Sequence, residues 1–205
     1  PRLGLYGGVI VGPPGAVYRE PVSGAEVSGT EIDTGWRADV LLPDGTAYRD
    51  FVLFLQDEDR IIGTHLMPYS QQVAGVVGLN YRNAGKWTSD TLPETPLLEA
   101  YAGDPIRLHV LVPSSEQAHV FSLEGHRWPF QPGRAGSDLL DAVQMGGLEA
   151  ATIQPVGGAG GEAALPGDYL YGDHRLPYRE AGLWGLLRVY PVGQGRPGLL
   201  PISNQ

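Results

Sequence analysis

Turn-forming residues break up the apolar runs of this chain. Thirty glycines and 18 prolines are scattered through its 205 residues, about twice their usual combined share of roughly 12%. They follow no fixed period, which excludes a collagen-like repeat, and they leave little room for long helices. Short strands joined by tight turns remain, so the sequence predicts an all-β protein, a Greek-key β-sandwich or barrel.

The apolar runs between these turns predict roughly nine or ten short strands. A clear turn is Pro43–Thr46 (PDGT), where proline fixes one φ angle and glycine accepts a positive φ. It precedes Phe51–Leu55, a continuous apolar run typical of a strand buried on both faces. Ile106–Val112 alternates as a half-buried strand does. We expect the glycine-rich Val156–Gly161 to be a hairpin loop, and one helical turn near Leu176–Gly182.

Charge and residue content exclude several classes of function. The net charge of −9, from 14 basic and 23 acidic residues, argues against a nucleic-acid partner because phosphate binding needs clustered positive charge. There is no run of about 18 consecutive apolar residues, so no membrane span is expected. The absence of cysteine excludes disulfides, zinc–thiolate sites, thiol nucleophiles and any copper centre built on a Cys thiolate.

The histidines are the first candidates for ligands or catalytic groups. His109 lies on an alternating strand and His65 in an irregular segment, and we expect both to be ordinary structural histidines. His119 begins a run in which successive side chains face opposite ways, so that its imidazole and the carboxylate of Glu124 could supply metal ligands. An ordinary strand that ends in a glycine turn is the simpler interpretation of that run.

A second cluster places Asp173 directly before His174. The carboxylate could orient the imidazole or share a metal ion with it. A serine-nucleophile triad is not expected, because no GxSxG turn is present.

At these two clusters the chain resembles the multicopper oxidases. HVFSLEGHRWP, which begins at His119, resembles the H-P-x-H-x-H-G-H strand of that family, and PGDYLYGDHRLPYREAGLWGLLRV, which begins at Pro166, resembles its closing segment. LGLYGGVIVGP, DFVLFLQDED and TPLLEAYAGDPIRLHVLV resemble further strands. The resemblance implies a cupredoxin-like fold for most of the chain.

The resemblance also implies where copper ligands would lie. His119 matches the first histidine of the type 1 copper site, while the cysteine, second histidine and axial positions hold Asp173, Tyr178 and Leu183. At the trinuclear-cluster positions His174 is retained, and Ser122, Glu124 and Gly172 replace histidines. His126 matches a family histidine that is not a ligand. A carboxylate cannot replace the soft thiolate that gives type 1 copper its character.

We therefore expect a cupredoxin-like domain with a degenerate copper site and a structural or assembly role. Residues 1–18 would be the terminal strand of a preceding cupredoxin domain plus a linker, and residues 19–205 the domain itself. Its partners would be other cupredoxin domains or subunits of the same protein. No cofactor is expected in this domain, and copper is expected elsewhere if the parent protein is an active oxidase.

Two further expectations concern the start of the chain and its location. Pro1–Val11 resembles a strand already under way, so we expect a piece of a longer protein, with exposed apolar surface where this segment meets missing partners. The family resemblance alone suggests a secreted or periplasmic protein.

Two alternatives remain open. His119, His174 and Asp173 could converge at one end of the sandwich as a metal-binding or oxidoreductase site, because two imidazoles and a carboxylate can hold non-haem iron or a harder divalent metal. Alternatively, the domain could be a non-metal module that stacks a carbohydrate or a peptide on its aromatic residues. The tryptophans considered for that role are Trp87, Trp128 and Trp184.

Overall fold

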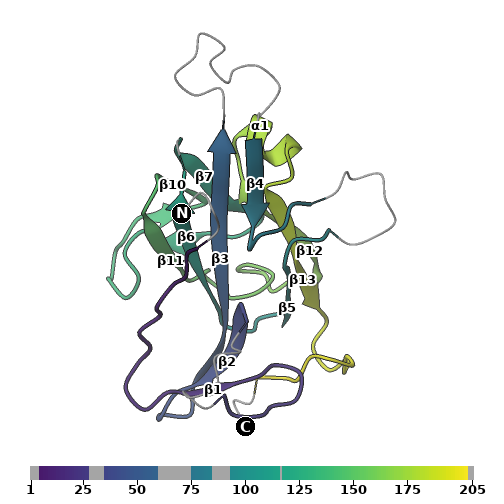
Figure 1. The fold of residues 1–205 in the computed structure, drawn as a ribbon. Coiled ribbons are helices and arrows are strands. Elements are labelled where there is room, and N and C mark those ends of the chain that lie inside the picture. Colours follow the sequence, from purple (N-terminus) through teal and green to yellow (C-terminus); the bar gives the residue numbers. More distant parts are fainter. Residues whose placement is uncertain (1–4, 28–34, 60–74, 85–92, 116, 203–205) are drawn as a thin grey trace.

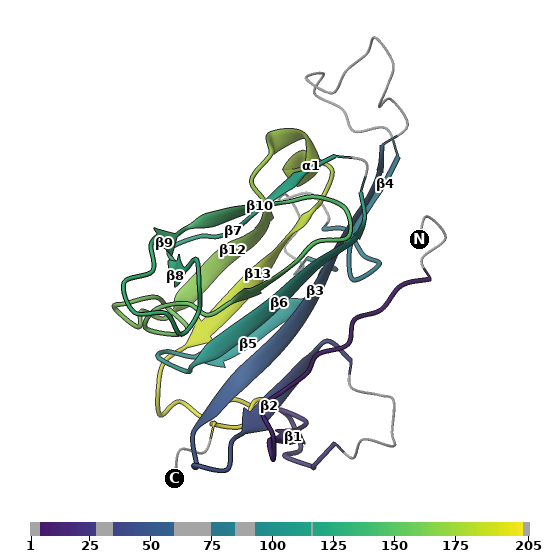
Figure 2. The same cartoon turned by 90° about the vertical axis from the view of Figure 1, so that its left-hand side faces the viewer.

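The computed structural model describes residues 5–27, 35–59, 75–84, 93–115 and 117–202, and they form two β-sheets packed face to face (Figures 1 and 2). The six-stranded sheet has the order β1 (Val17–Arg19), β2 (Arg37–Leu41), β3 (Ala47–Asp59), β6 (Ile106–Ser114) and β11 (Ala150–Ile153), with β4 (Gly75–Leu79) also paired to β3. The five-stranded sheet has the order β10 (Ala142–Met145), β7 (His119–Leu123), β12 (Gly167–Asp173), β13 (Trp184–Tyr190) and β5 (Leu97–Tyr101). A small hairpin pairs β8 (Trp128–Pro129) with β9 (Leu139–Leu140), and α1 (Leu176–Glu180) is the short helix. The prediction of an all-β sandwich is confirmed, as is the helical turn.

The long strand β3 organises the six-stranded sheet. One of its edges pairs in parallel with β6, and the other pairs first with β2 and then with β4. Side chains alternate along it, so Phe51, Leu53 and Leu55 lie in the core while Val52 and Phe54 are only half-buried. The expectation that Phe51–Leu55 is buried on both faces is therefore wrong, because the outer face of this sheet has no second layer as complete as the core.

The loop at Val156–Gly161 also differs from expectation. It leads from β11 to β12, which belong to different sheets, so it is a crossover between the sheets and not a hairpin loop. Gly158 has a φ of 72°, and a Cβ there would lie 2.4 Å from the carbonyl oxygen of Asp104. A glycine is required at this position because the crossover packs directly on the turn between β5 and β6.

The start of the described chain contains no strand. Residues 5–11 were expected to be one, but they run over the outer face of the six-stranded sheet without forming a ladder. Tyr6 holds this segment in place, stacked on Tyr81 at 4.7 Å between ring centroids and packed against Phe54 at 5.3 Å. Its hydroxyl donates to Oε1 of Gln56 at 2.9 Å. The segment is thus anchored by side chains and not by backbone pairing.

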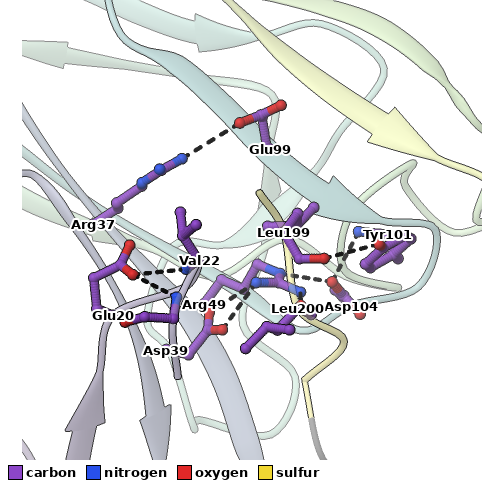
Figure 3. Close-up of polar contacts among 11 residues, drawn as sticks. Glu20, Val22, Arg37, Asp39, Arg49, Glu99, Tyr101, Asp104, Leu199 and Leu200 are labelled. Atoms are coloured by element: carbon purple, nitrogen blue, oxygen red, sulfur yellow. Dashed lines mark hydrogen bonds and ion pairs between the residues drawn. The ribbon is translucent and has the colours of Figure 1, made fainter. Parts of the chain in front are cut away.

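A buried arginine closes the end of the sandwich that lies away from α1 (Figure 3). Arg49, near the start of β3, is 1% exposed and donates to Asp104 at 2.7 Å, to Asp39 at 2.9 and 3.0 Å and to the carbonyl oxygen of Leu200 at 2.5 Å. Burial raises the pKa of Asp39 to about 6 although Arg49 opposes the shift. One guanidinium thereby connects β2, the turn after β5 and the segment that follows β13.

Candidate functional site

At the other end of β3, strands from both sheets bring three ionisable side chains together. His119 begins β7 and its side chain is completely buried. Its Nδ1 donates to Oδ2 of Asp173, at the end of β12, over 2.6 Å. Its Nε2 lies 3.1 Å from Oγ of Ser115 and 3.5 Å from Oδ1 of Asp57, near the end of β3. The imidazole therefore has oxygen atoms at both ring nitrogens.

This environment keeps His119 positively charged. Burial lowers the pKa of its imidazole, but the hydrogen bond to Asp173 and the nearby carboxylate of Asp57 outweigh burial and raise the pKa to about 9. At neutral pH the ring is an imidazolium between two carboxylates. Neither oxygen of Asp57 accepts a hydrogen bond from the residues that the structure describes, so the ion pair with His119 offsets the burial of its charge.

Asp173 also organises the surrounding loops. Its Oδ1 accepts hydrogen bonds from the backbone N–H groups of Val120 at 3.2 Å and Arg175 at 2.8 Å. The guanidinium of Arg175 donates in turn to the carbonyl oxygen of Ala118 at 2.6 Å and to Oε1 of Gln117 at 2.7 Å. A carboxylate with this many donors orients His119 and also holds the start of β7 against the end of β12.

Apolar side chains complete the surroundings of the imidazole. The ring of Tyr178, from α1, meets His119 edge-on with 4.9 Å between ring centroids. Tyr178 and Leu183 are both 0% exposed and belong to the hydrophobic core. These two residues stand where the resemblance implies the second histidine and the axial ligand of type 1 copper, so packed core occupies those positions.

The donor set here does not fit a type 1 copper centre. The thiolate position holds Asp173, whose carboxylate is engaged by the imidazole and by two backbone N–H groups. The neighbouring carboxylates raise the pKa of His119 to about 9, so a metal ion would have to displace a proton from this ring. Within the described ranges, no group of three or more His, Asp or Glu residues is arranged to hold one metal ion.

His174 lies apart from this cluster in its contacts. Its side chain is exposed and borders an open groove of about 490 Å³ together with Ser122, Glu124 and Asp141. Its backbone N–H donates to the carbonyl oxygen of Val120 at 2.7 Å. The structure thus brings His119 and Asp173 into direct contact and places His174 at the surface.

The remaining histidines have different environments. His126 is 2% exposed, with Nδ1 2.8 Å from the carbonyl oxygen of Glu124 and with Nε2 accepting from the N–H of Gly160 at 3.0 Å. Burial lowers the pKa of His126, which fits a neutral ring protonated at Nδ1 and a structural role. His65 lies outside the described residues.

The tryptophans proposed for ligand stacking are not available in the described part of the chain. Trp128 is 2% exposed and Trp184 is 5% exposed, so both are core residues. Trp87 lies outside the described residues.

Asp57 and Ser115 were not predicted as members of the site. Alternation along β3 would have identified Asp57, because it falls on the same face as Phe51, Leu53 and Leu55. For Ser115 the sequence carries no comparable signal.

Comparisons with known proteins identify the fold. No protein-family model matches the chain, and no curated protein matches it. The copper nitrite reductase of Nitrosomonas europaea matches with a TM-score of 0.52 at 15% identity, over 73% of this chain and 51% of that one. Multicopper oxidases of Pediococcus acidilactici and Campylobacter jejuni match with TM-scores of 0.49 and 0.46, at 13% and 14% identity, over 75% and 68% of this chain.

The chain spans about half of the nitrite reductase and 29% of each of these two oxidases. Among the described residues, no helix is long and apolar enough to cross a membrane. At these identities the likeness concerns architecture alone. The chain has a cupredoxin-like β-sandwich fold, as its sequence predicted.

Proposed function

We propose that this chain is a cupredoxin-like domain without type 1 copper, which serves a structural and assembly role in a larger protein resembling the multicopper oxidases. The observation that carries the proposal is the state of His119. Its Nδ1 is 2.6 Å from one carboxylate, its Nε2 faces a hydroxyl and a second carboxylate, and its pKa is raised to about 9. An imidazolium held in this way supplies the positive charge that a metal ion would otherwise bring.

The imidazolium also has a mechanical role in this proposal. It connects Asp57, on the six-stranded sheet, with Asp173, on the five-stranded sheet. Fully buried ion pairs of this kind make a domain intolerant of losing one partner, because the remaining charge is left without compensation. His119 therefore holds the two sheets in register at the end of the sandwich where α1 lies.

The assembly role is supported by the segment before β1. Alternate residues Leu5, Val9 and Val11 are 87%, 92% and 90% exposed, while Tyr6 between them is anchored to the sheet. An extended apolar segment of this kind is a ready partner for another strand or domain. We assign the segment before β1 to the end of a preceding cupredoxin domain plus a linker, and place the start of this domain at β1, because Val17 and Tyr18 already pair with β2 and the expected boundary after residue 18 would divide that strand. The partners would be other domains or subunits of the same protein, and any copper would be held in those partners. The protein would be secreted or periplasmic.

Metal content tests this function. The untagged protein is analysed by elemental mass spectrometry before and after incubation with Cu²⁺, followed by gel filtration. We expect copper, iron and zinc far below one ion per chain in both samples, and no visible absorption. A near-stoichiometric ion that disappears in His119→Ala or Asp173→Ala would overturn the proposal and favour the metal-site alternative with His119, His174 and Asp173.

A matched pair of variants tests the structural role. His119→Ala removes the buried imidazolium, and His174→Ala removes an exposed imidazole near the end of the same strand pair. We expect the first to lower the melting temperature strongly and the second to leave it nearly unchanged. Equal melting temperatures for the two variants would contradict the structural role.

A further inference from the structure

A second set of polar side chains lies on the outer face of the six-stranded sheet. Thr152 on β11, His109 on β6 and Asp50 on β3 come from three adjacent strands. Nδ1 of His109 is 3.1 Å from Oγ1 of Thr152, and Nε2 of His109 is 2.9 Å from Oδ1 of Asp50. A hydroxyl, an imidazole and a carboxylate are therefore in sequential contact, although His109 was expected to be an ordinary strand histidine.

The exposure of these groups suits nucleophilic catalysis, because the hydroxyl is accessible while the imidazole and the carboxylate are largely shielded from solvent. The side chains of Asp50 and His109 are 7% and 13% exposed, whereas Thr152 is exposed. Among the described residues, neither Oδ1 of Asp50 nor Nε2 of His109 has a hydrogen-bond partner, and the contact between these two atoms is a charge contact at 2.9 Å. The carboxylate favours the tautomer with the proton on Nε2, which leaves the lone pair of Nδ1 directed at the hydroxyl of Thr152.

The strands hold this arrangement rigidly. Thr152 and His109 are direct partners in the β11–β6 ladder, and His109 is the partner of Val52 on β3, two residues from Asp50. Groups positioned by paired strands keep their relative geometry better than groups on loops. Both distances fall within the range of about 2.6–3.2 Å expected between a nucleophile, its base and the group that orients the base.

A fixed cation and a cavity adjoin the three residues. Arg107 lies two residues before His109 on β6, so its side chain leaves the same face of the sheet. Its guanidinium lies 4.1 Å from the ring centroid of Tyr48, and the amide oxygen of Gln154, oriented by its hydrogen-bond partners, accepts from Nε and Nη2 at 2.8 Å. Arg107, Tyr48 and Gln154 line a surface cavity of about 540 Å³. Thr152, His109 and Asp50 do not line it, but each lies two positions along the chain from one of these three residues.

We infer that Thr152, His109 and Asp50 form an acyl-transfer site for small carboxylic esters that carry a negative charge, with Arg107 binding the anionic end. Thr152 is the nucleophile and His109 the general base, both catalytic residues, and Asp50 is a positioning residue. The charge preference follows from the guanidinium beside the cavity, which would also attract negative charge that develops on the carbonyl oxygen. This activity is independent of the copper question.

The reaction balances without a cofactor. Oγ1 of Thr152 bonds to the ester carbonyl carbon while its proton passes to Nδ1 of His109. The bond between that carbon and the alkoxy oxygen breaks, and the leaving oxygen takes the proton from His109. Water then attacks the acyl-threonine by the same route, which releases the carboxylic acid and restores the hydroxyl of Thr152.

The test uses p-nitrophenyl succinate as the anionic ester and p-nitrophenyl acetate as the neutral one. The measurements are the release of p-nitrophenolate and the site of acylation, located by peptide mass spectrometry. We expect the succinate to react faster and the acyl group to be found on Thr152. Thr152→Val keeps the volume and the strand preference but removes the nucleophile, and its rate should fall by about a hundredfold or more, the usual contribution of such catalysis.

Further variants separate catalysis from background and from folding defects. Thr152→Ser should retain activity, and His109→Gln should lose it. Asp50→Asn should alter the pH profile of the rate, and Arg107→Met should abolish the preference for succinate. His174→Gln, which removes an exposed imidazole outside the cluster, controls for hydrolysis by surface histidines and should react like the unmodified protein. Melting temperatures establish that each variant is folded. An unchanged rate in folded Thr152→Val, or acylation confined to other residues, would overturn the proposal.

Discussion

Two buried cations lie at the two ends of β3, and each is enclosed by a pair of aspartates. Near the start of the strand, Arg49 contacts Asp39 and Asp104 (Figure 3). Beyond Leu55, Asp57 and Asp173 face the two ring nitrogens of His119. Both clusters join segments that are distant in sequence, and both lie at the edge of the apolar core.

The two clusters differ in the chemistry of the cation. A guanidinium keeps its charge at every pH that a protein tolerates and offers donors in several directions, so Arg49 also binds the carbonyl oxygen of Leu200. An imidazole can lose its charge, so the cluster around His119 holds only while the ring is protonated. The same arrangement of charges therefore gives one end of the sandwich a permanent connection and the other a titratable one.

Removal of Arg49, the cation with the permanent charge, should lower the free energy of unfolding more than the other changes. Arg49→Met keeps much of the side-chain length but leaves Asp39 and Asp104 buried without a counter-charge. We expect a loss of about 3–5 kcal/mol in the free energy of unfolding, measured by urea denaturation, because breaking one partner of a buried pair leaves an uncompensated charge. Arg188→Met is the matched control, since its partner Asp168 is 42% exposed and such pairs contribute about 0–1 kcal/mol. Similar losses in the two variants would remove the distinction between buried and surface pairs.

The cluster around His119 should be recognised by the pH dependence of the free energy of unfolding. The pKa of His119 is raised from 6.5 to about 9, so the folded state binds this proton more tightly than the unfolded state does. The stabilisation is complete below pH 6.5 and is lost as the pH rises through about 9. The loss should be of the order of 3 kcal/mol, by the relation between a pKa shift and free energy.

Urea denaturation across this pH range, with the wild type beside His119→Gln and Arg49→Met, measures the effect. The fall in the free energy of unfolding with rising pH should persist in Arg49→Met and disappear in His119→Gln. A wild-type stability that does not change between neutral pH and the raised pKa would rule out a charged imidazole at this site.

The smallest effect should come from Asp39, whose stabilisation is also lost as the pH rises but over a more acidic range than that of His119. Its pKa is raised from 3.8 to about 6, so stability from this group is present below pH 3.8 and is lost as the pH rises through about 6. Asp39→Asn imitates the protonated carboxyl and leaves Arg49 paired with Asp104, so it should change the free energy of unfolding at neutral pH by only about 1 kcal/mol, well below the loss in Arg49→Met. It should also make the free energy of unfolding nearly independent of pH between about 3.8 and 6. A large loss at neutral pH would mean that the charged form of Asp39 is the stabilising one.

Different parts of the structure were predictable to different degrees. The alternation of Ile106–Val112 follows directly from its sequence and places Leu108 and Val110 in the core. The crossover at Val156–Gly161 was misjudged because glycine-rich turns look alike whether they return within one sheet or lead to the next. Residues 5–11 have the composition of a strand, but whether a strand forms depends on a neighbour with which to pair.

The candidate site was predictable in part. The family resemblance identified His119 and Asp173, whose contact at 2.6 Å is now the centre of the site. It could not place the side chain of His174 at the surface, because the rotation of a side chain at a strand end depends on packing. Asp57 follows the apolar run Phe51–Leu55, and its position in the strand alternation indicates that it faces the core.

The sequence by itself determined that β3 presents a charged residue at each end of an apolar face, since Arg49, Phe51, Leu53, Leu55 and Asp57 recur every second position. It also determined, through the absence of cysteine, that no thiolate-based copper centre can exist in this chain. Only the tertiary structure decided which groups meet those two charges. Their partners come from β2, from the turn after β5, from β7 and from β12, and strand alternation sets the face of a residue but not its neighbours across the core.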